Sequence, residues 1–481
     1  MDGAPLTSVA LCGSGLALWM SAAAFSKSLP NSVQMTVVDT DPNPASDMFY
    51  GHVLPPQFYD FHLSIDLSEP ELLLNTGSTF VFGTQMQNWA QPGRSWVQAF
   101  HQPLPVWEGV PLMKLIQQHP HATLQSTLIS AQAAKTGVFA HPSEDPEHPL
   151  SRAEYGYAIN PAELSRLYKA VAMRRNLQLI SAQIETVTRK DDTVTSLTLT
   201  DGQRVEADLF IDCTGPSAVL RAKGLAPANK SRSVTAKLSR NADTPLGAPV
   251  QRVSGSDAGW RSDVVLRSGA LRLTVADTSS ELDGNAASFQ IGRAEKAWHG
   301  NTIAIGHAAS ILEPFTVAPM KLLLRDIERV QSLLPVSSDM RIEAQEYNRA
   351  ARNDYDHASL FNQAHFAVPD LPDTPYWQTA AVKNDAPKLV RKLTQYNGRG
   401  YLVEYDNEPF DAVDWAVLHD GMGRTPHRAD PLAAAIDPET VQSCLDTLRK
   451  NIKAVVERMP PHPIYMSKFI AYLHRKYSRN G

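Results

Sequence analysis

The segment VALCGSGLALWM, residues 9–20, decides the fold class of this chain. Its apolar start predicts a buried strand over residues 8–12, and its glycines predict a turn. The run rich in alanine and leucine predicts a helix over residues 16–26. A second strand is expected in VQMTVVD, residues 33–39, which ends in an acidic residue. This order is typical of the βαβ unit that binds a dinucleotide, and it predicts an α/β fold.

The glycine turn has a chemical interpretation. Gly13 and Gly15 let the backbone approach a pyrophosphate, and the helix N-terminus at Leu16 and Ala17 favours its negative charge. Asp39 stands 24 residues after Gly15, where a carboxylate can accept hydrogen bonds from ribose hydroxyls. The usual motif has a third glycine where this chain has a leucine, so an ordinary glycine turn remains the alternative.

The length, charge and cysteine content of the chain favour a globular enzyme and argue against several other classes of protein. The chain has 481 residues, 43% of them hydrophobic, which suffices for a large enzyme with a sizeable core. The net charge of −5 gives no electrostatic reason to expect nucleic acid or an anionic membrane as a partner. Three cysteines far apart in sequence cannot form a disulfide framework or a CxxC metal site, so we expect a reducing, cytoplasmic location. The apolar stretch over residues 9–25 is too short and broken for a membrane helix.

Further elements follow the βαβ opening. A short helix is expected near residues 69–74 and a single strand over 78–86. Asn160, Pro161 and Glu163 are typical of the start of a helix. Strands are expected over residues 194–200, 208–212 and 302–306, followed by a helix over 320–334. The C-terminal quarter is expected to be mainly helical, and we place a boundary between residues 1–380 and 381–481.

Several segments, in order along the chain, resemble the flavin-dependent tryptophan halogenase family. Residues 13–20 resemble the GGGTAGWMAA opening, and YGHVLPP, residues 50–56, resembles the GEATxP flavin loop with His52 at the glutamate. DLFIDCTG, residues 208–215, is similar to DLFIDCSG. The segments NTIAIG, residues 301–306, and EPF, residues 313–315, resemble NVVAIG and the start of EPLEST. The resemblance spans residues 8 to 465.

This resemblance implies a glutathione-reductase-like FAD-binding fold with a β-rich substrate region and a helical C-terminal part. It implies that FAD arrives as FADH2 from a separate flavin reductase and that the substrate is aromatic or derived from an amino acid. A homodimer is left open. The implied cofactor-binding residues are Gly13, Gly15, Leu16, Ala17, Asp39, Gly51, His52, Gly306 and Pro314. The implied substrate-pocket residues are Val81, His101 and Phe315.

The chain departs from the family at the residues that handle halogen. Counting back from Asn88 and Trp89, the family's active-site lysine falls on Val81, and no lysine stands between Lys27 and Lys114. Thr316 replaces the family's second glutamate, and a hydroxyl cannot act as a carboxylate base. Pro319 lies where backbone amides hold the halide, and proline has no N–H. The WxWxIP signature survives only as residues 260–265. Halide use is therefore in doubt.

These departures favour an FAD-dependent monooxygenase over an ordinary halogenase. His52, His307 and Thr316 are the candidate proton donors near the flavin, while Lys321 is expected to be solvated. The alternatives are a working halogenase with relocated catalytic residues and a flavin-binding homologue without catalysis. No metal site is expected, because His119 and His121 lack a third ligand nearby.

Overall fold

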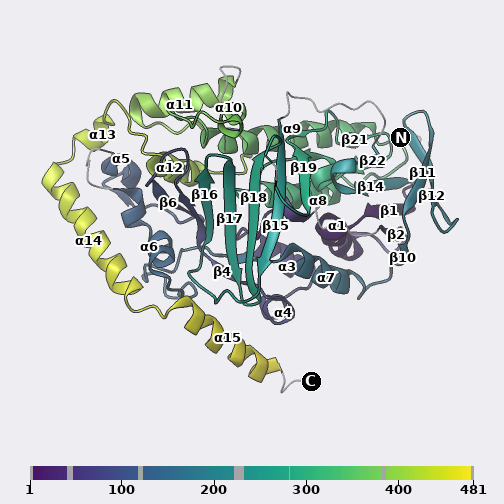
Figure 1. Cartoon of the computed structure of the whole chain (residues 1–481), viewed down its shortest axis with the longest axis horizontal. Coiled ribbons are helices and arrows are strands. Elements are labelled where there is room, and N and C mark those ends of the chain that lie inside the picture. Colours follow the sequence, from purple (N-terminus) through teal and green to yellow (C-terminus); the bar gives the residue numbers. More distant parts are fainter. Residues whose placement is uncertain are drawn as a thin grey trace.

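The computed structural model describes residues 4–40, 47–117, 123–221, 232–280, 282–381 and 386–477. Two sheets form the body of the molecule, with helices packed around them (Figure 1). The smaller sheet carries the glycine turn, and the larger sheet stands beside it in the middle of the molecule.

The six-stranded sheet contains the predicted βαβ unit. Its order is β10–β2–β1–β14–β22–β21, and its strands pair in parallel except for β21. Strand β1 runs Ser8–Gly13, helix α1 runs Gly15–Ser28 and strand β2 runs Gln34–Asp39. The remaining strands are β10 (Gln178–Ser181), β14 (Leu209–Cys213), β22 (Thr302–Ala304) and β21 (Trp298–His299). The predicted α/β class is confirmed.

The seven-stranded sheet has the order β19–β15–β18–β17–β16–β5–β6. Its strands are β15 (Ser233–Asn241), β16 (Gln251–Ser256), β17 (Gly259–Leu266), β18 (Gly269–Asp277), β19 (Ala286–Gln290), β5 (Gly83–Gln87) and β6 (Ser95–Ala99). The neighbours are antiparallel except β16 and β5, which are parallel. This sheet is the β-rich region expected between the cofactor-binding segments.

The prediction of one strand over residues 78–86 is wrong. Strand β4, Thr79–Val81, pairs with β9, Gly156–Ala158, whereas β5 belongs to the large sheet. Gly83, at the start of β5, has a φ of +149°, and a Cβ there would lie 2.2 Å from the carbonyl oxygen of Gln98. The chain changes sheets at this point because glycine alone fits the close approach.

Smaller strands and short helices connect these sheets. The strands are β3 (Val53–Leu54), β7 (Val106–Trp107), β8 (Val110–Pro111), β11 (Ile184–Lys190), β12 (Thr193–Leu199), β13 (Arg204–Val205), β20 (Gly292–Arg293) and β23 (Ser310–Ile311). The helices are α3 (Phe58–Ser64), α4 (Glu69–Asn75), α5 (Leu112–Ile116), α6 (Ile129–Thr136) and α7 (Pro161–Ala172). The expected start of α7 is confirmed, since the Asn160 side chain accepts from the Ala162 N–H.

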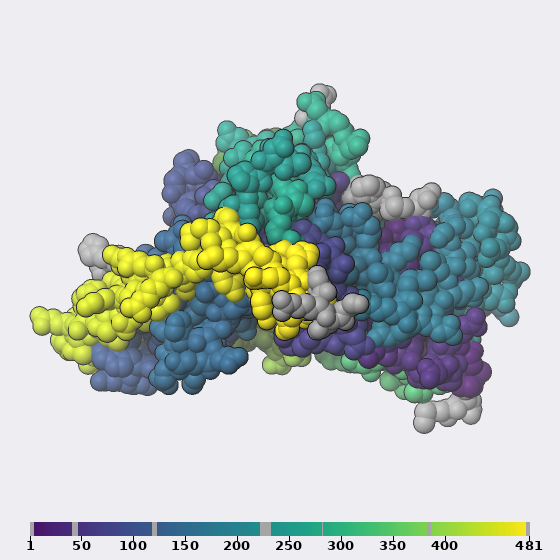
Figure 2. Space-filling model, turned by 90° about the horizontal axis from the view of Figure 1, so that it is seen from below, coloured from purple at the N-terminus to yellow at the C-terminus, as the bar shows by residue number. Residues whose placement is uncertain are grey.

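The C-terminal part is helical, as expected. It comprises α8 (Ala318–Ser332), α9 (Arg341–Ala364), α10 (Pro375–Ala380), α11 (Pro387–Arg399), α12 (Ala412–Gly421), α13 (Pro431–Ala434), α14 (Pro438–Val456) and α15 (His462–Tyr477). Figure 2 shows α14 and α15, in yellow, as a band across the face seen from below. Helix α12 packs on β6, which brings this part of the chain to the large sheet. In the described ranges, we find no helix with the length and apolar character needed to cross a membrane.

Candidate functional site

The glycine turn places the N-terminus of α1 at the carboxyl edge of the six-stranded sheet. A Cβ on Gly13, whose φ is +145°, would lie 2.1 Å from the carbonyl oxygen of Cys213, so the turn requires glycine there. The Leu16 N–H donates to both carboxylate oxygens of Asp47, at 2.9 and 3.1 Å. Burial raises the pKa of Asp47 to about 7. The N-terminus of α1 thus binds a carboxylate of the protein itself, as expected for a helix terminus that can bind an anion.

Other predicted cofactor residues lie at the ends of neighbouring parallel strands. Asp39 ends β2 and forms an ion pair with Lys169, whose Nζ lies 2.7 Å from Oδ2. Gly306 follows β22, and its neighbour His307 donates its backbone N–H to the Tyr50 hydroxyl at 2.9 Å. The Tyr50 and His307 rings are stacked with centroids 3.7 Å apart. The fold therefore brings these segments to one edge of the sheet, where doubly wound folds bind dinucleotides.

His52 lies in the loop that the sequence assigned to the flavin. Its exposed fraction is 1%, and neither ring nitrogen has a hydrogen-bond partner in the described structure. Burial lowers its pKa to about 4, so the ring is neutral at neutral pH and has one N–H to donate. A Cβ on the adjacent Gly51 would lie 3.1 Å from Cβ of Pro314, which places the two loops in contact. Buried polar groups normally have partners, so the unsatisfied ring fits a bound polar cofactor such as FAD.

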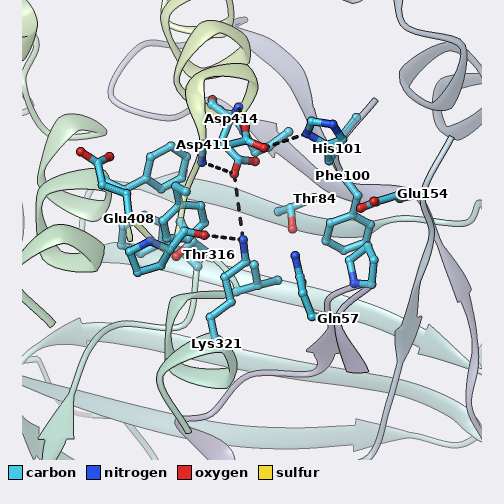
Figure 3. Close-up of a pocket in the computed structure, with 18 of the residues that line it drawn as sticks. Gln57, Thr84, Phe100, His101, Glu154, Thr316, Lys321, Glu408, Asp411 and Asp414 are labelled. Carbon is cyan, nitrogen blue, oxygen red and sulfur yellow. Dashed lines mark hydrogen bonds and ion pairs between the residues drawn. The ribbon is translucent and has the colours of Figure 1, made fainter. Parts of the chain in front are cut away.

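A cavity of about 220 Å³ lies between the large sheet, the start of α8 and the segment leading into α12 (Figure 3). His101 and Phe315, two of the predicted pocket residues, line it, and Thr316 does so too. The described lining does not include Val81. That side chain is 1% exposed and packs in a separate apolar cluster with Val53, Ala158, Val264, Leu266 and Leu271.

The polar groups at the start of α8 already have hydrogen-bond partners within the protein. The Thr316 hydroxyl donates to Oδ1 of Asn362 at 2.7 Å and accepts from the Ala318 N–H at 3.2 Å. Pro319 follows and has no N–H. Neither amide at positions 318 and 319 is therefore free to hold an anion. Thr316 contributes to the cavity wall, but its hydroxyl is committed to this turn.

The expectation that Lys321 is solvated is wrong. Its side chain is 13% exposed, lines the cavity and donates to the carbonyl oxygen of Pro409 at 2.7 Å. Its Nζ lies 4.0 Å from Oδ2 of Asp414 and 4.5 Å from the centroid of the Phe410 ring. Burial raises the pKa of Asp414 to about 6. The sequence carried no signal for this burial, because a single lysine in the apolar run of residues 320–324 is typical of the exposed face of an amphipathic helix.

Glu313 fixes the loop that leads into this wall. Its carboxylate is buried and accepts from Nε1 of Trp260 at 2.8 Å and from the Tyr376 hydroxyl at 2.7 Å, and it forms an ion pair with Arg232. Trp260, the remnant of the WxWxIP signature, therefore holds the backbone at residues 313–316 rather than facing the cavity. Sequence patterns alone did not indicate this role.

No group of three potential metal ligands occurs in the described parts of the chain. His119 and His121 lie outside the described residues.

Comparisons with known proteins agree with this arrangement. The model of the tryptophan halogenase family matches residues 8–438. The chain is 21% identical to the tryptophan 6-halogenase SttH of Streptomyces toxytricini, over 95% of this chain and 97% of that protein. It is 23% identical to the tryptophan 7-halogenase KtzQ of Kutzneria sp., over 82% of each. The structure of BrvH, a flavin-dependent halogenase from Brevundimonas sp. BAL3, superposes with a TM-score of 0.87 at 26% identity, covering 96% of this chain and 99% of that one. The chain therefore belongs to the tryptophan halogenase family of flavin-dependent enzymes.

Proposed function

We propose that this flavin-dependent oxidoreductase carries out monooxygenation, rather than ordinary halogenation, of an aromatic or amino-acid-derived substrate held in the cavity beside Lys321. FAD is the cofactor of this family, and a separate flavin reductase supplies it as FADH2. Because the named relatives act on tryptophan, an indole is our first choice of ring.

The first turn of α8 is the observation that carries this proposal. A halide needs hydrogen-bond donors, and the segment of residues 317–319, where the family resemblance implies them, offers fewer here. The Ala318 N–H is bonded to Thr316, and Pro319 has none. At position 81 a buried valine replaces the lysine that would carry the oxidised halogen. These features support a reaction that needs no halide.

The residues around the cavity have the properties that oxygen transfer requires. Reduced FAD, when bound, supplies the activation of O2. The Lys321 Nζ lies in the cavity wall, where its N–H groups can stabilise a negative charge that develops on oxygen. Asp414 beside it is the matching acceptor. His52 can donate one N–H toward the cofactor from a buried position.

Halogenation is the second candidate, and Lys321 is the observation that favours it. An ammonium that lines the cavity could replace the missing lysine at position 81, although it comes from α8 rather than β4. The two candidates differ in whether halide takes part in the reaction.

Rapid mixing of the reduced FAD complex with O2, with and without bromide or chloride, separates the candidates. Monooxygenation predicts that the rate of flavin reoxidation is independent of halide and that an aromatic product carries one oxygen atom from labelled O2. Reoxidation accelerated by halide, or a halogenated product, would contradict the proposal. Peroxide as the only product with every aromatic tested would also contradict it and would favour a flavin-binding homologue without catalysis.

The Lys321→Met and Lys321→Arg variants identify the role of the ammonium. Oxygenation is expected to fall by about two orders of magnitude in the methionine variant and by less in the arginine variant, because arginine keeps the charge. Leu322→Met, on the same helix, is the matched control for substitution in α8. FAD binding, measured by flavin fluorescence, should be unchanged in all three.

A further inference from the structure

The charged groups of the cavity wall are committed to partners in the protein, with one exception. Lys321 bonds to Pro409, and Arg325 pairs with Asp354. Among the acids, Asp411 pairs with His101 and caps α12, and Glu408 forms a buried ion pair with Lys392. Asp414 faces Lys321 and accepts from the Asp411 N–H at 3.1 Å. The fourth acid of the lining, Glu154, makes no hydrogen bond or ion pair with any described residue. Figure 3 shows Glu154 and Glu408 on opposite sides of the cavity.

Glu154 nevertheless lies in a partly desolvated place. It precedes β9, is only partly exposed and lines the cavity. Desolvation raises its pKa, and the nearby charges of His101 and Lys321 lower it. A half-buried carboxylate without a donor is costly, so a bound group that donates hydrogen bonds would be stabilised there.

Two neutral groups of the same wall are also unsatisfied acceptors. Gln98 donates its Nε2 to the carbonyl oxygen of Asp414 at 3.0 Å, which leaves its buried Oε1 without a partner. His365 has a pKa lowered to about 3 by burial, and its Nδ1 lies 2.9 Å from the carbonyl oxygen of Phe361. The Nδ1 must therefore carry the proton, and the buried Nε2 is an acceptor without a partner. The buried polar atoms of this wall that lack a partner, Gln98 Oε1 and His365 Nε2, are thus both hydrogen-bond acceptors.

The rest of the wall is suited to a ring. Phe315, Phe361 and Phe410 line the cavity together with Met86. Aromatic and thioether side chains bind a flat ring by packing, and they contribute no further donor or acceptor.

We propose that the substrate is an aromatic compound with a protonated amine, and that Glu154 selects it by accepting the N–H groups of that ammonium. The inference rests on the proposed function only in using the same cavity. A substrate that carries a carboxylate but no ammonium would meet the negative charge of Glu154 and would bind more weakly.

Equilibrium binding to the cofactor-free protein tests this selection without the reaction. Titration calorimetry with tryptamine, 3-methylindole and indole-3-propionate compares an ammonium, a neutral group and a carboxylate on one ring. We expect tryptamine to bind about tenfold or more tightly than the other two. Equal affinities, or a preference for the carboxylate, would overturn the proposal.

The Glu154→Gln variant tests the residue itself. It should lose about tenfold in affinity for tryptamine and keep its affinity for 3-methylindole. Glu144→Gln removes the same charge from an exposed surface position and should change neither. Unchanged tryptamine binding in Glu154→Gln would overturn the assignment, and equal melting temperatures of the variants confirm that folding is intact. Because no O2 or reduced flavin is present, this outcome is independent of whether the enzyme oxygenates or halogenates.

Discussion

Asp47 shows how a single residue can link the cofactor site to pH. Its carboxylate accepts the Leu16 N–H at the terminus of α1, and the residue is half-buried. A pKa raised from 3.8 to about 7 means that the folded protein holds this proton more tightly than the unfolded chain. Below the unfolded pKa the carboxyl is neutral in both the folded and the unfolded state, and the folded state has its full stability. As the pH rises toward about 7, the unfolded chain ionises more readily than the folded protein, so the free energy of unfolding falls.

Asp47→Asn should remove this part of the pH dependence. The wild type is expected to lose on the order of a few kcal/mol of unfolding free energy between pH about 4 and about 7 that the variant does not lose. Urea denaturation across this range measures the difference. Asp373→Asn, at an exposed position, serves as the control and should follow the wild type. Parallel pH curves for wild type and Asp47→Asn would contradict the prediction.

At the scale of the element, the pairing of strand β4 determines where the side chain of Val81 lies. The strand pairs with β9 in a small sheet, and Val81 points into an apolar cluster rather than into the lining of the cavity. Helix α8 instead brings Lys321 into the lining of the cavity, because its first turns face the cavity. The sequence showed that position 81 holds no lysine, but not that a lysine of another element lines the cavity.

Val81→Lys alone should not create halogenation, because the Ala318 N–H is still bonded to Thr316 and Pro319 still has no N–H to offer a halide. A lysine in the cluster of Val53 and Val264 would also be buried without a partner, which we expect to destabilise the protein by several kcal/mol. Thermal unfolding and a product assay with tryptophan and chloride measure both effects. Val81→Met, similar in length but uncharged, is the control. Chlorotryptophan from Val81→Lys would sink this prediction.

At the scale of the whole molecule, the last helix is tied to a strand far away in sequence. His462 begins α15, and its Nδ1 lies 2.8 Å from the carbonyl oxygen of Gly247. Its Nε2 lies 2.8 Å from the Thr79 hydroxyl. Burial lowers the pKa of His462 to about 4, so the ring is neutral, donates from Nδ1 and accepts at Nε2. The boundary at residue 380 remains a prediction, but the two parts share these contacts.

His462→Ala should therefore weaken the whole fold rather than α15 alone. It removes two buried hydrogen bonds and leaves a cavity, at a cost of about 2–4 kcal/mol. We expect one cooperative calorimetric transition at a lower temperature, without an early separate loss of the C-terminal helices. His474→Ala, exposed on the same helix, should melt like the wild type. Two separated transitions in His462→Ala would show that residues 381–481 unfold independently.

The sequence by itself determined the βαβ unit, the strand ends at residues 208–212 and 302–306, and the family, because these depend on local periodicity, glycine turns and collinear segments. It also identified the absence of a lysine at position 81 and of an N–H at Pro319, which are facts of residue type. The tertiary structure alone decided that Asp47 occupies the terminus of α1, that Lys321 is half-buried in the cavity wall and that Glu154 has no partner among the described residues. These contacts join residues from different elements, and no periodic pattern records which side chains meet once burial and hydrogen-bond satisfaction have selected the packing.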